Sequence, residues 1–345
     1  MYYFFILFIL LNPFKTYAGL NLSAIYSEST QIFEIIDQVS KWHEKNWSAY
    51  GKYWEDNLKF SSKQREMINQ YIELRRKYKV KRDESSKTLI FSNPSKTYDI
   101  ISHTFYTSKT VDQALTKLKK TMKKEELKFL EKMYIEFKPK LSILVKESLI
   151  FKDKIKVIGK MISKEKIKPV FNKAYKFFNL PKFIKGQFSV QYVWAPPSLG
   201  VKMEIIGQHI LIRKHPVTLE SDPDKRELIT KLILALSALQ TKSQQLNLTT
   251  QFYSLCVPPN NTSRFNLVEY PLAIALGVMS MEEKLQKKKF DLFQKWSDDS
   301  WVNLFSKMLF PVVKLAMKNR ENINGQFIPS AAKMCRDISN VAKNY

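Results

Sequence analysis

The stretch Arg226-Glu227-Leu228-Ile229-Thr230 opens an amphipathic segment, and its place after a strand-like run decides how we interpret the fold. Leucines at positions 228, 232, 236 and 239 predict a helix of about twenty residues. Asp222 and Pro223 are typical of a helix start, with an N-cap side chain followed by proline at the first helical position. A second helix is expected to carry residues 268–273, VEYPLA.

A strand pattern precedes the first of these helices. Phe188, Val190, Tyr192 and Trp194 alternate with residues 189, 191 and 193, which is the period of a strand with one buried face. A turn is expected at residues 195–200, followed by a second strand at 201–205 and a third at 209–213.

Residues 186–280 resemble the catalytic half of the gluzincin metallopeptidases. The resemblance lies in the order of the elements, which is a β-hairpin, the helix that carries residues 226–230, a loop and a second helix. In that family the first helix carries His-Glu-x-x-His and the second supplies a glutamate, so that three ligands meet at one zinc ion. By this resemblance Glu227 matches the general base and Glu269 matches the third ligand. Arg226 and Thr230 stand where the two histidines belong, and neither is a good zinc ligand.

The resemblance implies a zincin-like core without metal or cofactor, in which Glu227 is a vestigial general base. It favours an inactive homologue over an enzyme. The implied function is binding of a peptide or protein segment along the hairpin edge and over a floor of Arg226, Glu227, Thr230 and Glu269. Tyr192 and Trp194 are expected to belong to the same binding site.

An arginine at position 226 has a further consequence for this predicted site. A guanidinium paired with a buried Glu269 would stand where the zinc ion lies in the family. A structural explanation without any binding site also accounts for Glu227, because the helix dipole favours a glutamate in the first turn of any helix.

Two other functions are compatible with the sequence. The first is an active metal-dependent hydrolase with displaced ligands, His209 or His215 together with Glu227 and Glu269. The second is a cationic envelope protein that binds anionic surfaces through residues 117–185, where lysines alternate with hydrophobic residues. Ordinary amphipathic helices with solvated lysines have the same pattern.

The composition limits the partners. The net charge of +25 comes mostly from lysine, and it attracts acidic surfaces in general. Arginine is sparse and no nucleic-acid-binding fingerprint occurs, so we expect no specific nucleic-acid partner. The two cysteines and four histidines have no compact metal-ligand spacing. Whether Cys256 and Cys335 form a disulfide is left open by the sequence.

The N-terminus reads as an export signal. Residues 2–11 form an apolar run too short to span a bilayer as a helix, and Thr16 and Ala18 place small side chains before Gly19. We therefore expect a signal peptide over residues 1–18 and an exported protein, periplasmic or secreted, without a transmembrane segment after cleavage. An uncleaved anchor is the alternative.

The predicted fold class is α+β and mainly helical, with a small β-hairpin or sheet in a zincin-like core. We expect an N-terminal helical region over residues 19–185 and a zincin-like region over 186–345, which are compatible with packing as one domain. Within the first region, Thr110 and Gln113 form a capping-box pattern, and a turn is expected near residues 122–124.

Overall fold

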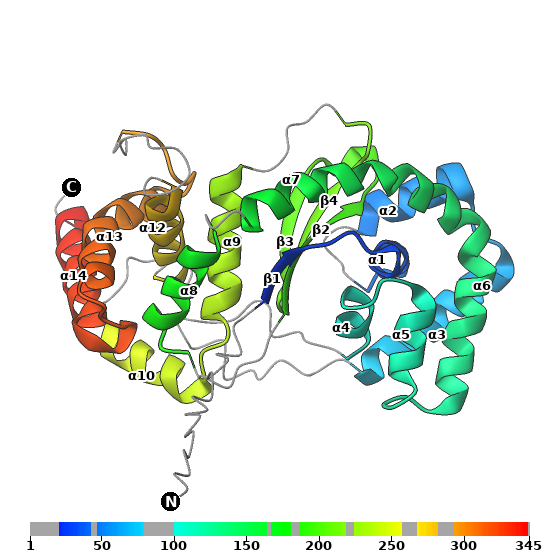
Figure 1. Cartoon of the computed structure of the whole chain (residues 1–345), viewed down its shortest axis with the longest axis horizontal. Coiled ribbons are helices and arrows are strands. Elements are labelled where there is room, and N and C mark those ends of the chain that lie inside the picture. The colour runs from blue at the N-terminus through cyan, green and yellow to red at the C-terminus, as the bar shows by residue number, and fades with distance from the viewer. Residues whose placement is uncertain are drawn as a thin grey trace, which may run out of the picture.

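The computed structural model describes residues 21–42, 47–78, 100–163, 167–180, 187–218, 224–256, 268–281 and 293–343. Within them, a four-stranded mixed sheet lies between two groups of helices (Figure 1). The strand order is β1-β2-β4-β3, in which β1, β2 and β4 are parallel and β3 is antiparallel to β4. The strands are β1 (Asn21–Ala24), β2 (Gln187–Trp194), β3 (Lys202–Ile206) and β4 (His209–Lys214).

Strand β2 confirms the predicted strand, but both of its faces are buried. Phe188, Val190 and Tyr192 pack with the C-terminal helices, whereas Val193 packs with the N-terminal helices. A sheet with parallel strands is normally covered by helices on both sides. Successive side chains of β2 therefore point into two different hydrophobic clusters, instead of alternating between a core and solvent. The second and third predicted strands form the β-hairpin, as β3 and β4, and β4 lies between β2 and β3.

Strand β1 was not expected from the sequence. It pairs with β2 from Asn21↔Gln187 to Ala24↔Val190 and then leaves the sheet. The side chain of Gln31 continues the pairing: its Nε2 donates to the Tyr192 carbonyl at 2.6 Å, and its Oε1 accepts from the Trp194 amide at 2.8 Å. A helix side chain thus satisfies backbone groups that a longer β1 would have paired.

The N-terminal helices cover one face of the sheet. Helix α5 begins as predicted, because Thr110 Oγ1 accepts from the Gln113 amide at 3.3 Å, and the expected turn separates α5 from α6. The elements of this group are α1 (Glu28–Val39), α2 (Trp47–Tyr53), the π-turn Trp54–Leu58, α3 (Ser62–Tyr78), α4 (Ile100–Tyr106), α5 (Val111–Leu118) and α6 (Lys124–Glu147).

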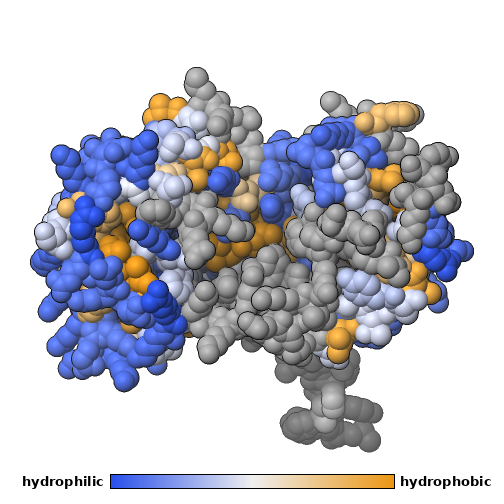
Figure 2. Space-filling model, turned by 180° about the vertical axis from the view of Figure 1, so that it is seen from behind, coloured by the Kyte–Doolittle hydropathy of each residue, from blue (hydrophilic) through white to orange (hydrophobic). Residues whose placement is uncertain are grey.

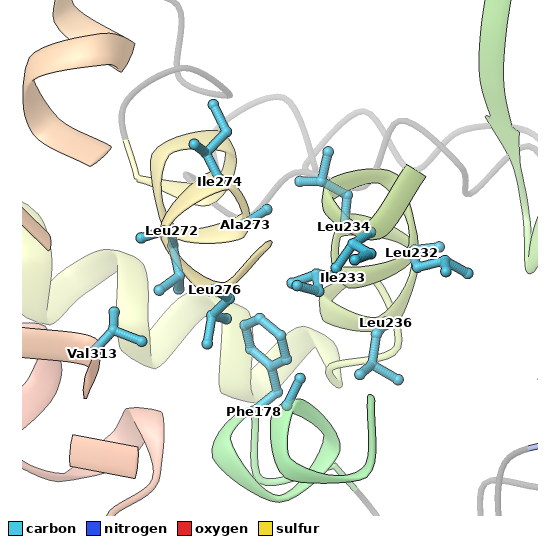
Figure 3. Close-up of a cluster of buried hydrophobic side chains, with 14 of the residues drawn as sticks. Phe178, Leu232, Ile233, Leu234, Leu236, Leu272, Ala273, Ile274, Leu276 and Val313 are labelled. Atoms are coloured by element: carbon cyan, nitrogen blue, oxygen red, sulfur yellow. The ribbon is translucent and has the colours of Figure 1, made fainter. Parts of the chain in front are cut away.

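The C-terminal helices cover the other face. Helices α9 and α12 lie side by side at the centre of this group, with Ile233, Leu276 and Phe178 between them (Figure 3). The elements are the 3-10 turn Ser148–Ile150, α7 (Phe151–Ser163), α8 (Lys168–Phe177), α9 (Lys225–Ser237), α10 (Lys242–Tyr253), α12 (Glu269–Met281), α13 (Ser300–Lys318), the π-helical turn Ile323–Phe327 and α14 (Ile328–Lys343). A further 3-10 turn, Pro197–Leu199, follows β2, and its Leu199 packs against the N-terminal cluster.

Two hydrophobic clusters, one on each face of the sheet, make up the core. Along the helical run from α6 to α7, Leu144 belongs to the N-terminal cluster and Phe151 to the C-terminal cluster. Leu22 of β1 and the buried residues of α7 and α8 also join the C-terminal cluster. The fold is therefore α+β and mainly helical, as predicted, with both groups of helices packed on one sheet.

The outer surface differs between the two groups. Seen from behind, hydrophilic side chains dominate the N-terminal group, and hydrophobic surface is exposed between the groups (Figure 2). None of the helices that the structure describes combines the length and apolar character needed to cross a bilayer.

Candidate functional site

The first turn of α9 carries Arg226 and Glu227. The helix begins two residues later than predicted, because its N-cap is Asp224 rather than Asp222, and the Asp224 side chain accepts from the Arg226 amide at 3.1 Å. The same carboxylate lies 3.6 Å from the Arg226 guanidinium. Glu227 is exposed, as a first-turn acid often is, while the Arg226 side chain is about one-quarter exposed at 25%.

Helices α9 and α12 approach each other most closely at Thr230 and Gly277. A Cβ atom on Gly277 would lie 2.8 Å from Thr230 Oγ1 and 3.7 Å from the Arg226 carbonyl oxygen. Thr230 is buried in this contact. Glycine is required at position 277 because no larger residue fits without displacing Thr230.

Glu269 lies at the other end of the same helix pair. Its Oε1 is 3.0 Å from Ser237 Oγ, and its Oε2 has no hydrogen-bond partner. Thr230 and Ser237 are seven residues apart, or about 10 Å along the helix axis. The helices are antiparallel, so the expected floor of Arg226, Thr230 and Glu269 is not brought together.

The predicted ion pair between Arg226 and Glu269 is therefore wrong. Arg226 contacts Asp224 at the helix start, and Glu269 contacts Ser237 about three turns further along α9. Burial raises the pKa of the Glu269 carboxyl well above its usual range, and the Ser237 hydrogen bond only partly offsets this. Burial thus favours the protonated, neutral form of this carboxyl, which needs no counter-ion in an apolar core.

Tyr192 and Trp194 are core residues, which corrects their prediction as ligand contacts. Tyr192 is 2% exposed and stacks on Phe151 with ring centroids 5.3 Å apart. Trp194 is 1% exposed, and its Nε1 donates to Glu147 at 2.8 Å. The Trp194 ring lies at the end of β2 and packs with the N-terminal cluster, where the Tyr53 ring of α2 contacts it edge-on. Trp194 and Tyr192 therefore belong to different clusters.

The histidines also lie away from Glu227 and Glu269. His209 Nδ1 is 2.8 Å from Ser189 Oγ on the N-terminal face of the sheet, and burial lowers its pKa to about 3. His215 packs edge-on against Trp194. The proposed displaced ligand sets are thus not assembled, and the described ranges contain no group of three or more histidine, cysteine or acidic side chains placed to hold a metal ion.

Strand β3 is the one feature of the predicted site that the fold does present. It forms an edge of the sheet, and α9 packs against both β3 and β4 (Figure 1). Ile206 and His209 flank a two-residue turn with Gly207 at φ 60°, so they form a hydrogen-bonded pair. The amide and carbonyl groups of Met203 and Ile205 consequently point away from β4.

Sequence reasoning missed a buried charge network on the N-terminal face. Helix α1 contributes Glu34, which pairs with Arg213 of β4 at 2.6 Å, with both side chains fully buried. One turn on, Asp37 pairs with Arg75 of α3 at 2.8 Å, again fully buried. The available signal was a pair of acids three residues apart within the apolar run 32–39, and charges in such a run require buried partners.

A groove between α1, α5 and α6 was also not predicted. Its volume is about 820 Å³, and hydrophobic side chains including Ile32 and Leu115 line it. Three acids (Glu28, Asp112 and Glu131) and three lysines (Lys119, Lys138 and Lys146) also line it. These balanced charges favour no particular sign of ligand.

The two cysteines form a disulfide. Cys256 follows α10 and Cys335 lies in α14, with their Cα atoms 5.7 Å apart. Both residues are buried in the C-terminal cluster. The bond closes a loop between residues separated by 79 positions, which settles the pairing that the sequence left open.

Comparisons with known proteins found no relative of this chain. No family model, curated protein or solved structure matches the chain. The gluzincin resemblance rests on the sequence motifs of this chain.

Proposed function

We propose that this protein binds an extended peptide or protein segment along the outer edge of β3, beside α9, in a zincin-like fold that does not hydrolyse it. The observation that carries the proposal is the direction of the Met203 and Ile205 backbone groups, which point away from β4. An added strand would bind these groups as β-sheets commonly bind peptides.

The order and packing of the elements support a zincin-like core. An edge strand, a hairpin return through β4, the helix α9 and a second helix packed on α9 follow one another along the chain. The close contact of Thr230 with Gly277 fits a helix pair whose interface takes small residues.

The identity of the side chains supports binding over hydrolysis. By the sequence resemblance Arg226 takes the place of a ligating histidine, and its guanidinium cannot be deprotonated to bind a metal. Glu227 is exposed on α9 and carries a charge suited to recognising a basic group on a bound segment. Glu269 is withdrawn from this region and serves the core instead.

Export is part of the same proposal. The buried disulfide between Cys256 and Cys335 is of the kind that persists in oxidising compartments. The predicted signal peptide lies outside the described residues, and processing of the N-terminus is measured directly by sequencing the secreted protein.

A proline substitution tests the peptide site. Met203→Pro removes one outward amide hydrogen while leaving the β3–β4 hydrogen bonds in place, because proline is tolerated where a strand edge faces outward. The control, Met203→Val, keeps the amide and suits a strand. Peptides selected from a random extended library on the wild-type protein should bind Met203→Val and lose at least tenfold in affinity for Met203→Pro.

Equal binding by both variants would refute the β3 site. Metal analysis of the purified protein after incubation with zinc, run beside Glu227→Ala, separates binding from the hydrolase alternative. About one zinc per chain, lost in Glu227→Ala, would favour the hydrolase.

A further inference from the structure

We propose that the outer face of the helical run from α6 to α7 is a docking surface for anionic phospholipid membranes. This α6–α7 surface consists of the exposed hydrophobic residues Ile143, Leu149, Ile150 and Val157 and the lysines Lys146, Lys156 and Lys160. Lys146 and Leu149 lie at its border with the groove between α1, α5 and α6, which they also line. It is independent of the β3 edge and of any peptide bound there.

Exposed hydrophobic residues are concentrated on this run. Among the described residues, five of the eleven large hydrophobic side chains that are exposed lie between positions 135 and 157. Ile143 and Ile150 are each 52% exposed and Val157 is 65% exposed. Scattered single leucines occur on any protein surface, whereas a cluster on one run marks a site of interaction.

The spacing places these residues on one side of the run. Helix α6, the 3-10 turn Ser148–Ile150 and α7 follow without a break, and the turn residues have helical backbone angles at both caps. Ile143, Lys146, Ile150, Val157 and Lys160 recur at intervals of three, four and seven residues, which keeps them on one face.

The opposite side of α7 is fixed to the sheet. Phe151, Ile155, Ile158 and Ile162 are buried in the C-terminal cluster, where α7 packs on β1 and β2. The exposed residues therefore cannot turn inward. Figure 1 shows α6 and α7 along the outer border of the molecule, where a large planar partner can approach them.

The charge on this run selects an anionic partner. Residues 143–160 contain five lysines against two acids, Glu147 and Asp153, a local charge of +3. Glu147 accepts from Trp194, and Asp153 forms an exposed pair with Lys156 at 2.8 Å, which the local charge of +3 already includes. Lysines beside apolar side chains suit a membrane, because the apolar groups enter the interface while the ammonium groups reach the phosphates.

Vesicle binding tests the proposal. The full exported chain should bind vesicles containing about one-third phosphatidylglycerol and should not bind phosphatidylcholine alone. Binding should weaken steeply when NaCl is raised from about 0.05 to about 0.5 M. The triple variant Lys146→Gln, Lys156→Gln, Lys160→Gln should lose about fivefold in affinity for each lysine removed.

Matched variants distinguish binding through this surface from binding that depends only on the net charge or on exposed hydrophobic residues elsewhere on the protein. Lys314→Gln, Lys318→Gln and Lys333→Gln together remove the same charge from α13 and α14 and should bind as wild type. Ile143→Ser, Ile150→Ser and Val157→Ser together should lose at least tenfold. Leu246→Ser, Leu304→Ser and Leu315→Ser, which start 54%, 46% and 59% exposed, should lose nothing.

Three results would overturn the proposal. Equal losses from both lysine sets would show that net charge alone acts, and equal losses from both apolar sets would show that this surface is not special. Wild-type binding by the Ile143, Ile150 and Val157 variant, together with equally tight binding to soluble polyphosphate, would indicate a soluble polyanion instead of a membrane. Circular dichroism of each variant checks that the exposed substitutions leave the fold intact.

Discussion

Glu269 and Ser237 meet between α12 and α9, with 3.0 Å separating Glu269 Oε1 from Ser237 Oγ. The Ser237 hydroxyl is also 2.9 Å from the Leu234 carbonyl oxygen, and it has only one hydrogen to donate. A protonated Glu269 resolves this competition, because it donates to Ser237 while Ser237 donates to Leu234. The geometry and the raised pKa of Glu269 therefore agree on a neutral carboxyl.

The raised pKa of Glu269 makes stability depend on pH. In the unfolded chain this carboxyl ionises near its ordinary pKa, whereas in the folded protein it stays protonated to a higher pH. Its contribution to stability is complete below the unfolded pKa and is lost as pH rises toward the folded pKa, by about 1.4 kcal/mol for each pH unit. Glu269→Gln keeps the shape without the ionisation, so urea unfolding should show it to be more stable than wild type at pH 7. The two proteins should converge near pH 4, and a wild-type advantage at pH 7 would contradict a buried neutral acid.

The contact between Gly277 and Thr230 predicts a strongly non-additive pair of substitutions. Gly277→Ala places a methyl group 2.8 Å from Thr230 Oγ1 and should cost about 1–3 kcal/mol of unfolding free energy, since a β-branched side chain cannot easily move away. In a Thr230→Ala background the nearest remaining atom is the Thr230 amide nitrogen at 3.5 Å, an ordinary contact. There the same change should be neutral or should stabilise by up to about 1 kcal/mol through helix propensity. A double-mutant cycle by chemical denaturation measures this, and additive effects would show that the helices do not approach here.

The buried pair of Arg75 and Asp37 should be costly to break from one side. Arg75→Met leaves Asp37 as a fully buried charge and should lower the free energy of unfolding by about 3–5 kcal/mol. Combining it with Asp37→Asn should recover part of that loss, because no unpaired charge remains. The exposed pair of Arg65 and Glu55 is the control, and Arg65→Met should cost less than about 1 kcal/mol. Equal costs for the two arginines would mean that Arg75 is solvated.

The Cys256–Cys335 disulfide should be the largest single covalent contribution to stability. Replacing both cysteines by serine removes a cross-link between residues 79 positions apart and should cost roughly 4 kcal/mol in the chain-entropy model. Thiol titration of the unfolded, unreduced protein should find no free thiol. The reduced wild-type protein and the double variant should have the same free energy of unfolding. A difference between the two values would show that the serine side chains themselves change the stability.

The local predictions succeeded where the cause is local. Alternation in residues 188–193 identified β2, and the Thr110 side chain fixed the start of α5, because both depend on neighbours within a few positions. Strand β1 was not predicted, because its formation depends on a distant part of the chain. Its four residues form a strand only because β2, some 165 residues later, offers an edge for them to pair with.

The candidate site divides in the same way. By itself, the sequence determined a helix opening with Arg226 and Glu227, strands before it, and a second helix that carries Glu269. Only the tertiary structure decided that α9 and α12 pack antiparallel with Thr230 against Gly277, which places the contact between Glu269 and Ser237 about 15 Å along α9 from Glu227 in the first turn. Periodicity fixes which face of a helix is buried, whereas the sliding of one helix along another is fixed by side-chain contacts between distant parts of the chain.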